Sequence, residues 1–160
     1  MDLDPRLHFV TATAIIVKTD ANGKPKFLIL KRSMSEKAFP GKWTVPGGKL
    51  VRKEYEALPY KTAYPQWYNM MDWLLRKEVR EEAGIEIEKP EYLTDLIFIR
   101  PDGFPVVTLS FWARYKSGEV KLSDKNDMSE FAWVTTEEAK SYDMIEGIAA
   151  EIEALEKLLK

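Results

Sequence analysis

The sequence predicts an α/β fold with a mixed sheet, a central helix and a C-terminal helix. Phe9–Lys18 and Lys26–Arg32 are apolar and rich in β-branched residues, as is typical of paired strands. Apolar residues with helical spacing then predict a long helix from about Pro65 to Gly84. A second amphipathic stripe predicts a terminal helix over Ile145–Lys160.

Turn residues mark the borders of these elements. Asn22 and Gly23 tolerate positive φ, so they predict a hairpin between the first two strands. A short strand over Trp43–Val45 should run into a Pro-Gly-Gly turn. Pro65 suits the first turn of the central helix, and Gly84 suits its C-cap.

The second half of the chain continues the alternation of strands and helices. A turn at Pro101–Gly103 should join two strands as a hairpin. Thr135 or Thr136 is expected to cap a short helix. The elements expected here are strands over Tyr92–Arg100, Pro105–Tyr115 and Phe131–Val134, and a helix over Glu137–Tyr142.

Composition bounds the class of protein. The chain has 160 residues, of which 45% are hydrophobic and 31% charged, which suits one globular domain over residues 1–160. A net charge of −2 provides no positive field, so we expect no stable nucleic-acid partner. With no cysteine and only His8, thiol and histidine-rich metal chemistry are excluded. No apolar run is long enough for a membrane span and no signal peptide is evident, so we expect a cytoplasmic protein.

The most informative residues are Glu78, Glu81 and Glu82, which have the spacing i, i+3 and i+4 and are followed by Gly84. On a helix these side chains fall within about 100° of arc and repel one another by a few tenths of a kcal/mol per pair. A hard divalent cation offsets this repulsion, and Mg²⁺ takes carboxylate oxygens together with substrate phosphates. An exposed acidic helix face is the alternative for such a run taken alone.

The surrounding residues favour the metal site. Trp43-Thr-Val-Pro-Gly-Gly48 lies upstream, Glu54 follows Gly48 after five residues, and Lys77–Ile85 reads KEVREEAGI. Together these resemble the Nudix box and place the chain with the MutT-type Nudix hydrolases. The resemblance implies an α/β/α sandwich in which the central helix carries the catalytic glutamates.

Two departures from the box concern its spacing and its first residue. Twenty-two residues separate Glu54 from Lys77 where the family motif has seven, so an insertion occupies about residues 55–73. Lys77 stands where the family has arginine, and lysine has no planar fork to orient carboxylates. The aromatic side chains of the insertion could stack on a base or cover the site, pack a helical turn onto the sheet, or form a dimer contact.

The resemblance also implies roles for individual residues. The expected Mg²⁺ ligands (Mn²⁺ being an alternative) are the carboxylates of Glu78, Glu81 and Glu82 and the carbonyl of Gly48. The expected catalytic residues are Glu78, Glu81 and Lys77, with Glu130 as the favoured acid of the loop Ser123–Glu130, where Asp124 and Asp127 are alternatives. The expected substrate-binding residues are Arg32, Trp43, Gly47 and Glu54.

The function implied is Mg²⁺-dependent cleavage of a nucleoside diphosphate linked to another group. The first expectation is a (d)NTP or oxidised (d)NTP, hydrolysed to the monophosphate and pyrophosphate by a monomer or homodimer. The nearest rival is an ADP-ribose or nucleotide-sugar pyrophosphatase, for which Pro101 is a weak marker. RNA decapping is more distant. A non-hydrolytic nucleotide sensor is the alternative of another class, favoured only by Lys77 and the insertion.

Overall fold

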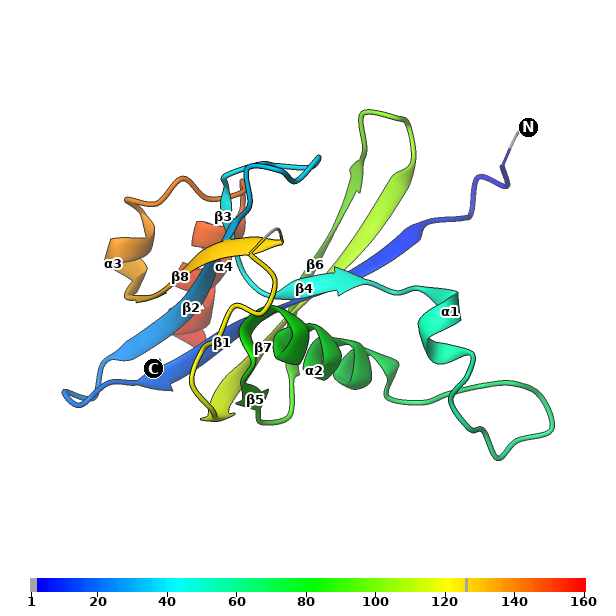
Figure 1. Ribbon diagram of the computed structural model, residues 1–160, viewed down its shortest axis with the longest axis horizontal. Coiled ribbons are helices and arrows are strands. Elements are labelled where there is room, and N and C mark those ends of the chain that lie inside the picture. The colour runs from blue at the N-terminus through cyan, green and yellow to red at the C-terminus, as the bar shows by residue number, and fades with distance from the viewer. Residues whose placement is uncertain (1–2, 126) are drawn as a thin grey trace.

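An eight-stranded mixed sheet lies between two layers of helix in the computed structural model, which describes residues 3–125 and 127–160 (Figure 1). The strands are β1 (Phe9–Thr19), β2 (Pro25–Arg32), β3 (Trp43–Thr44), β4 (Gly47–Lys49), β5 (Glu86–Ile87), β6 (Glu91–Ile99), β7 (Pro105–Ser117) and β8 (Met128–Val134). The helices are α1 (Arg52–Tyr55), α2 (Met70–Ala83), α3 (Thr136–Ala139) and α4 (Ile148–Leu158).

The centre of the sheet is a parallel pair, β1 and β7, aligned from Phe9 opposite Val106 to Val17 opposite Arg114. β2 runs antiparallel to β1 and is flanked by β3 and β8, while β6 pairs antiparallel with β7. β4 pairs with the first part of β1 and places Gly47 opposite Thr13. Gly47 and Gly48, which the sequence placed in a turn, therefore belong to a strand beside the centre of the sheet.

Alternate residues of the central strands pack on opposite faces. Ala12, Ala14 and Ile16 of β1 face the apolar side of α2, including Leu75 and Val79. Ile15 and Val17 face the other way, against α4 and its residues Ile148, Ile152 and Leu155. A sheet covered on both faces needs strands that are apolar at successive positions, as these are. The α/β/α arrangement expected from the sequence is confirmed.

The central helix begins later than expected, at Met70 and not near Pro65. Asn69 has a left-handed backbone with φ of 59°, which breaks helical continuity with the preceding residues. Trp67 precedes the helix, and its indole N–H donates to the carbonyl of Leu58 at 2.9 Å. The end of the helix was predicted correctly, since Gly84 is a left-handed C-cap with φ of 68°.

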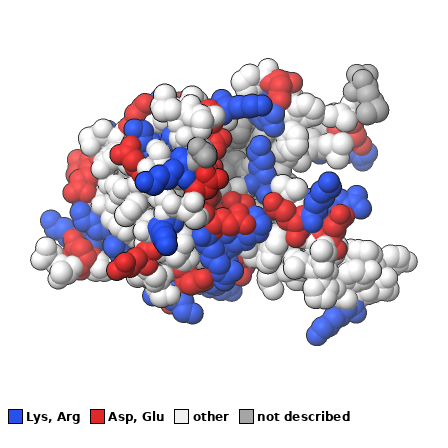
Figure 2. All heavy atoms as spheres, in the orientation of Figure 1, with Lys and Arg blue, Asp and Glu red and all other residues white. Residues whose placement is uncertain are grey.

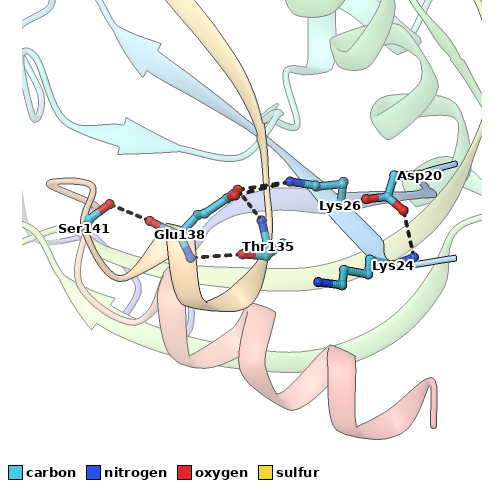
Figure 3. Close-up of polar contacts among 6 residues, drawn as sticks. All are labelled: Asp20, Lys24, Lys26, Thr135, Glu138 and Ser141. Carbon is cyan, nitrogen blue, oxygen red and sulfur yellow. Dashed lines mark hydrogen bonds and ion pairs between the residues drawn. The ribbon is translucent and has the colours of Figure 1, made fainter. Parts of the chain in front are cut away.

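The two C-terminal helices are shorter than expected. Gly147 is left-handed with φ of 96°, so α4 begins at Ile148 and not at Ile145, whose N–H donates to the carbonyl of Trp43. α3 covers Thr136–Ala139 and is held by a capping box between Thr135 and Glu138 (Figure 3). The prediction of a threonine cap is thereby confirmed for Thr135.

β8 begins at Met128, three residues before the expected start at Phe131. Its extra residues continue the pairing with β2, where Lys31 lies opposite Glu130. Glu130 is therefore a strand residue and not a loop residue. The short elements α1, β4 and β5 were not predicted, because two to four residues are too few to show a period.

The insertion runs from Tyr55, the last residue of α1, through the irregular residues 56–69 to the first turn of α2, and it projects from one end of the molecule (Figure 1). Trp73 packs against the core beneath α2, as the helical-turn alternative requires. Tyr55 and Tyr60 instead each pack against Trp67. Packing onto the sheet therefore explains only the end of the insertion.

Candidate active site

The buried face of α2 determines where its glutamates point. Leu74, Leu75, Val79 and Ala83 are fully buried beneath the sheet, so the helix presents its acidic side to β4. Glu82 Oε1 accepts a hydrogen bond of 3.0 Å from the N–H of Gly47. The acidic helix and the Pro-Gly-Gly segment thus meet, although 34 residues separate Gly47 from Glu82 along the chain.

Glu82 is a buried carboxylate, with 6% of its surface exposed. Burial raises the pKa of Glu82 well above its usual range. The N–H of Gly47 and the charge of Arg32 act in the other direction, while Glu78 and Asp127 add to the increase. The ionised form of Glu82 therefore has too little positive charge near it. A bound cation would supply that charge.

Glu78 lies directly against Gly48. A Cβ at Gly48 would stand 2.3 Å from the carboxyl carbon of Glu78 and 2.5 Å from its Oε1, so only glycine leaves room for this carboxylate. Burial raises the pKa of Glu78, against the opposing effect of Lys77. Glycine at position 48 therefore brings a backbone segment and a carboxylate into contact.

Lys77 holds three carboxylates together. Its Nζ lies 3.2 Å from Glu54 Oε2, 3.2 Å from Glu78 Oε1 and 3.3 Å from Glu81 Oε2. Burial acts to lower the pKa of Lys77, but the bonds to Glu78, Glu54 and Glu81 outweigh it and the pKa is raised. The lysine thus supplies a permanent positive charge between α1 and α2.

A second polar group lies where β2 meets the start of β8. The side chain of Arg32 donates to the carbonyl of Ala38 at 2.8 Å and to Glu36 Oε2 at 3.2 Å. Asp127 lies beside them, and burial and the neighbouring Glu36 raise its pKa. Because the charge of Asp127 also acts on Glu82, this group borders the glutamates of α2.

The structure brings most of the predicted site residues together. Those that meet through direct contacts are Gly47, Gly48, Glu54, Lys77, Glu78, Glu81 and Glu82. Arg32 borders them through its charge. In the space-filling view, acidic and basic side chains mix at the centre of the face that α2 occupies (Figure 2).

Two predicted site residues have other neighbours. Glu130 forms an ion pair of 3.0 Å with Lys31 on the surface of β8. Trp43 packs edge-on to Tyr142 and belongs to the core on the α4 side of the sheet, opposite to α2. The structure therefore does not bring the Trp43 side chain to the glutamates.

The sequence did not indicate Glu36 as a site residue, and it did not single out Asp127 among the loop acids. Glu36 follows Arg32 by four residues, which is a spacing for an ion pair but gives no indication of a site. Asp127 was one of three loop acids considered. Their meeting depends on the pairing of β2 with β8, which a single sequence does not reveal.

The donor set fits a hard cation such as Mg²⁺. Carboxylates from two helical turns and the backbone of a glycine are oxygen donors of the kind that Mg²⁺ takes. Among residues 3–125 and 127–160, however, no three acidic or histidine side chains already converge as a closed metal site. In this structure Lys77 draws Glu54, Glu78 and Glu81 onto itself, so these carboxylates are held by an ammonium group.

The NUDIX domain family model matches residues 75–155, just over half of the chain, beginning where the insertion ends. The chain belongs to the NUDIX family. It is a Nudix hydrolase, an enzyme of the class that acts on pyrophosphate bonds. No curated protein matches the chain by sequence.

Solved structures share the fold over nearly the whole chain. A MutT NUDIX hydrolase from Burkholderia pseudomallei is 20% identical, with a TM-score of 0.70, over 94% of this chain and 99% of that one. The NUDIX domain of Shewanella oneidensis NrtR, complexed with ADP ribose, is 16% identical, with a TM-score of 0.73, over 99% and 95%. An Ap4A hydrolase from C. elegans is 20% identical, with a TM-score of 0.65, over 94% and 97%.

Proposed function

We propose that the protein is a Mg²⁺-dependent pyrophosphohydrolase that converts a (d)NTP or an oxidised (d)NTP to the monophosphate and pyrophosphate. The contact of buried Glu82 with the N–H of Gly47 carries the proposal, because it unites the acidic helix with the glycine pair of β4. Membership of the NUDIX family supports hydrolysis of a pyrophosphate bond. The fold shared with a MutT NUDIX hydrolase supports the nucleotide class.

Four groups would hold the metal ion, namely the carboxylates of Glu78, Glu81 and Glu82 and the backbone carbonyl of Gly48. When bound, Mg²⁺ or Mn²⁺ supplies positive charge for the pyrophosphate oxygens and lowers the pKa of water. Gly48 leaves space for the Glu78 carboxylate. Gly47 fixes the orientation of Glu82 through its N–H.

Lys77 and Arg32 would position the remaining groups. Lys77 orients Glu78 and Glu81 and links them to Glu54, so that Glu54 supports the site from α1. The guanidinium group of Arg32 donates one hydrogen bond to the carbonyl of Ala38 and another to Glu36. These bonds hold its charge at the end of β2, beside Glu82. From there it would meet the phosphates of the substrate. This positioning is most of what phosphoryl chemistry requires of a protein.

The general base would be a carboxylate that reaches the attacking water. Glu78 and Glu81 are candidates on the helix, and Glu130 was the favoured candidate outside it. The ion pair of Glu130 with Lys31 weakens its case. Asp127 is the stronger alternative, because its charge acts on Glu82 and burial raises its pKa.

ADP-ribose is the second candidate substrate. It is favoured by the fold shared with the NUDIX domain of NrtR, whose structure contains ADP ribose. Pro101, at the turn between β6 and β7, is the weaker sequence marker. A non-hydrolytic nucleotide sensor would bind at the same residues without turnover.

We further propose that residues 1–160 form one Nudix domain, acting as a cytoplasmic monomer or homodimer on small nucleotides. Among the described residues, no helix is both long and apolar enough to cross a membrane. The net charge of −2 disfavours a stable nucleic-acid partner.

The proposal is tested by hydrolysis of a substrate panel with and without Mg²⁺. The panel comprises common and 8-oxo (d)NTPs, ADP-ribose, dinucleoside polyphosphates and a capped RNA. Glu82→Gln is the matched variant, since an amide keeps the acceptor for Gly47 but loses the charge. We expect metal-dependent turnover of a (d)NTP that Glu82→Gln abolishes. Faster hydrolysis of ADP-ribose than of any (d)NTP would reassign the protein to the ADP-ribose pyrophosphatases. Saturable nucleotide binding without turnover would favour the sensor.

A further inference from the structure

The insertion contains an aromatic cavity that the proposed function does not use. The cavity has a volume of about 560 Å³, within the size range of small-molecule sites. Its lining residues are Arg52, Tyr55, Glu56, Tyr60, Pro65 and Trp67. Figure 2 shows mostly uncharged surface on the lobe where Figure 1 places the insertion.

The rings of this cavity have fixed orientations. Tyr55 and Tyr60 pack edge-on to Trp67, with ring centroids 5.3 and 5.7 Å away. The indole N–H of Trp67 donates to the carbonyl of Leu58 at 2.9 Å. Because its polar atom is already bonded, Trp67 offers a fixed apolar ring surface, which lowers the entropic cost of binding a flat ligand.

The lining chemistry suits a planar, uncharged ring. Four of the six lining residues are aromatic or proline. The only charged groups on the wall are Arg52 and Glu56, whose ion pair of 2.8 Å leaves it without net charge. A phosphate would find no free cation on this wall, whereas every nucleobase has a face that stacks on aromatic side chains.

α1 connects the cavity to the glutamates of α2. Tyr55 and Glu56 line the cavity, and the preceding residue, Glu54, lies 3.2 Å from the ammonium group of Lys77. Lys77 in turn contacts Glu78 on the catalytic face of α2. A nucleotide has two ends of the required kinds. Its base suits the aromatic cavity, and its phosphates suit a metal ion held by the glutamates.

We propose that the cavity lined by Tyr55, Tyr60 and Trp67 binds the nucleobase of the substrate while its phosphates lie at the α2 glutamates. The inference rests on the proposed function for the phosphate end alone. It makes the insertion a binding element for the base. If the aromatic cluster only maintained the shape of the loop, a substitution in it would weaken the binding of every ligand equally.

The test compares two ligands that differ by the nucleoside. Calorimetry with Mg²⁺ measures binding of α,β-methylene-ADP, which has a base, and methylenediphosphonate, which has none. Trp67→Ala should weaken the first by about tenfold or more, the range for one stacked base, and leave the second unchanged. Trp67→Phe retains a ring and should stay within about threefold of the wild type.

Tyr64→Ala is the control, because Tyr64 belongs to the same insertion, is 80% exposed and does not line the cavity. It should bind both ligands as the wild type does. Thermal unfolding of each variant separates loss of fold from loss of the site. Equal weakening of both ligands by Trp67→Ala, no weakening of either, or a wild type that does not bind α,β-methylene-ADP would overturn the proposal. Base-dependent binding without hydrolysis of any nucleotide would retain the subsite and reject the proposed function.

Discussion

The ammonium group of Lys77 lies 3.2 Å from a carboxylate oxygen of Glu54 and joins two parts of the motif that the insertion separates in sequence. The same ammonium group contacts Glu78 and Glu81 on its own helix. A lysine can meet three carboxylates in this way because its donors rotate about a point charge, whereas an arginine fork favours one bidentate partner. The insertion therefore lengthens the chain between the two halves without separating them in space.

Replacing Lys77 with methionine should lower kcat/KM by at least about tenfold, because the three carboxylates lose the charge that orients them. We expect the free energy of unfolding without divalent metal to fall by about 1–3 kcal/mol, the range for hydrogen bonds to charged groups. Lys77→Arg keeps the charge but replaces the rotating donors with a planar fork, so its kcat/KM should lie between those of Lys77→Met and the wild type. Steady-state kinetics at varied Mg²⁺ and thermal unfolding measure both effects.

Arg80→Met is the control for Lys77→Met. Arg80 lies on the same helix but its ion pair, of 2.8 Å to Glu86, is on the surface. Exposed pairs contribute about 0–1 kcal/mol, so this variant should retain activity. Full activity of Lys77→Met would contradict the positioning role.

The two glycines of β4 predict different losses on substitution. Alanine at position 48 would drive its Cβ against the carboxyl group of Glu78, which can swing away, so activity should fall while the fold remains. Alanine at position 47 would place its Cβ 2.4 Å from the carbonyl oxygen of Ala12 in β1, which cannot move freely. We expect Gly47→Ala to cost about 1–3 kcal/mol of stability, as overpacking does.

Hydrolysis and thermal unfolding, measured on both glycine variants, test this contrast. An active Gly48→Ala protein would show that the position of Glu78 against β4 is not needed for hydrolysis. A Gly47→Ala protein as stable as the wild type would contradict the close packing of β4 on β1.

Local sequence patterns predicted the parts of the fold that depend on neighbours in the chain. The apolar runs of β1 and β2, the C-cap at Gly84 and the acidic spacing of α2 all belong to this kind. The left-handed backbone of Asn69 was not foreseen, because asparagine also occurs within helices and nothing nearby marks it as a break. The helix start was therefore placed too early.

The site was predicted where the motif is continuous and missed where it depends on strand pairing. Glu78, Glu81 and Glu82 followed from one segment. The group of Arg32, Glu36 and Asp127 forms only because β2 pairs with β8, with Arg32 opposite Met128 after a bulge. One sequence gives no register for that pairing, so Glu130 was placed in the loop and Asp127 was ranked below it.

The two acids at the start of β8 can be separated by substitution. Asp127→Asn should lower kcat by about 100-fold or more if Asp127 is the general base, the usual contribution of such a group. Glu130→Gln should change kcat by less than about threefold, because an exposed pair with Lys31 contributes little. Both substitutions remove one charge and retain the shape of the side chain, so each controls for the other. The reverse order of effects would make Glu130 the base, as first predicted from the sequence.

The capping box of α3 predicts a pH dependence of stability. Glu138 accepts a hydrogen bond from the N–H of Thr135 and forms an ion pair of 3.2 Å with Lys26 (Figure 3). These contacts, that with Thr135 first, lower the pKa of Glu138. Because the folded pKa is lowered, the stabilisation is present above the unfolded value of about 4.3 and is lost as the pH falls through the folded value.

Glu138→Gln should therefore be less stable than the wild type at pH 7, and the difference should shrink as the pH falls below about 4. Urea unfolding of both proteins from neutral to acidic pH measures this difference. Glu137→Gln is the matched control, because Glu137 is the neighbouring residue and pairs only with Lys140 among its described contacts. It should show a smaller loss at pH 7. A Glu138→Gln protein whose deficit is constant with pH would show that the shape of the side chain, and not its charge, maintains the cap.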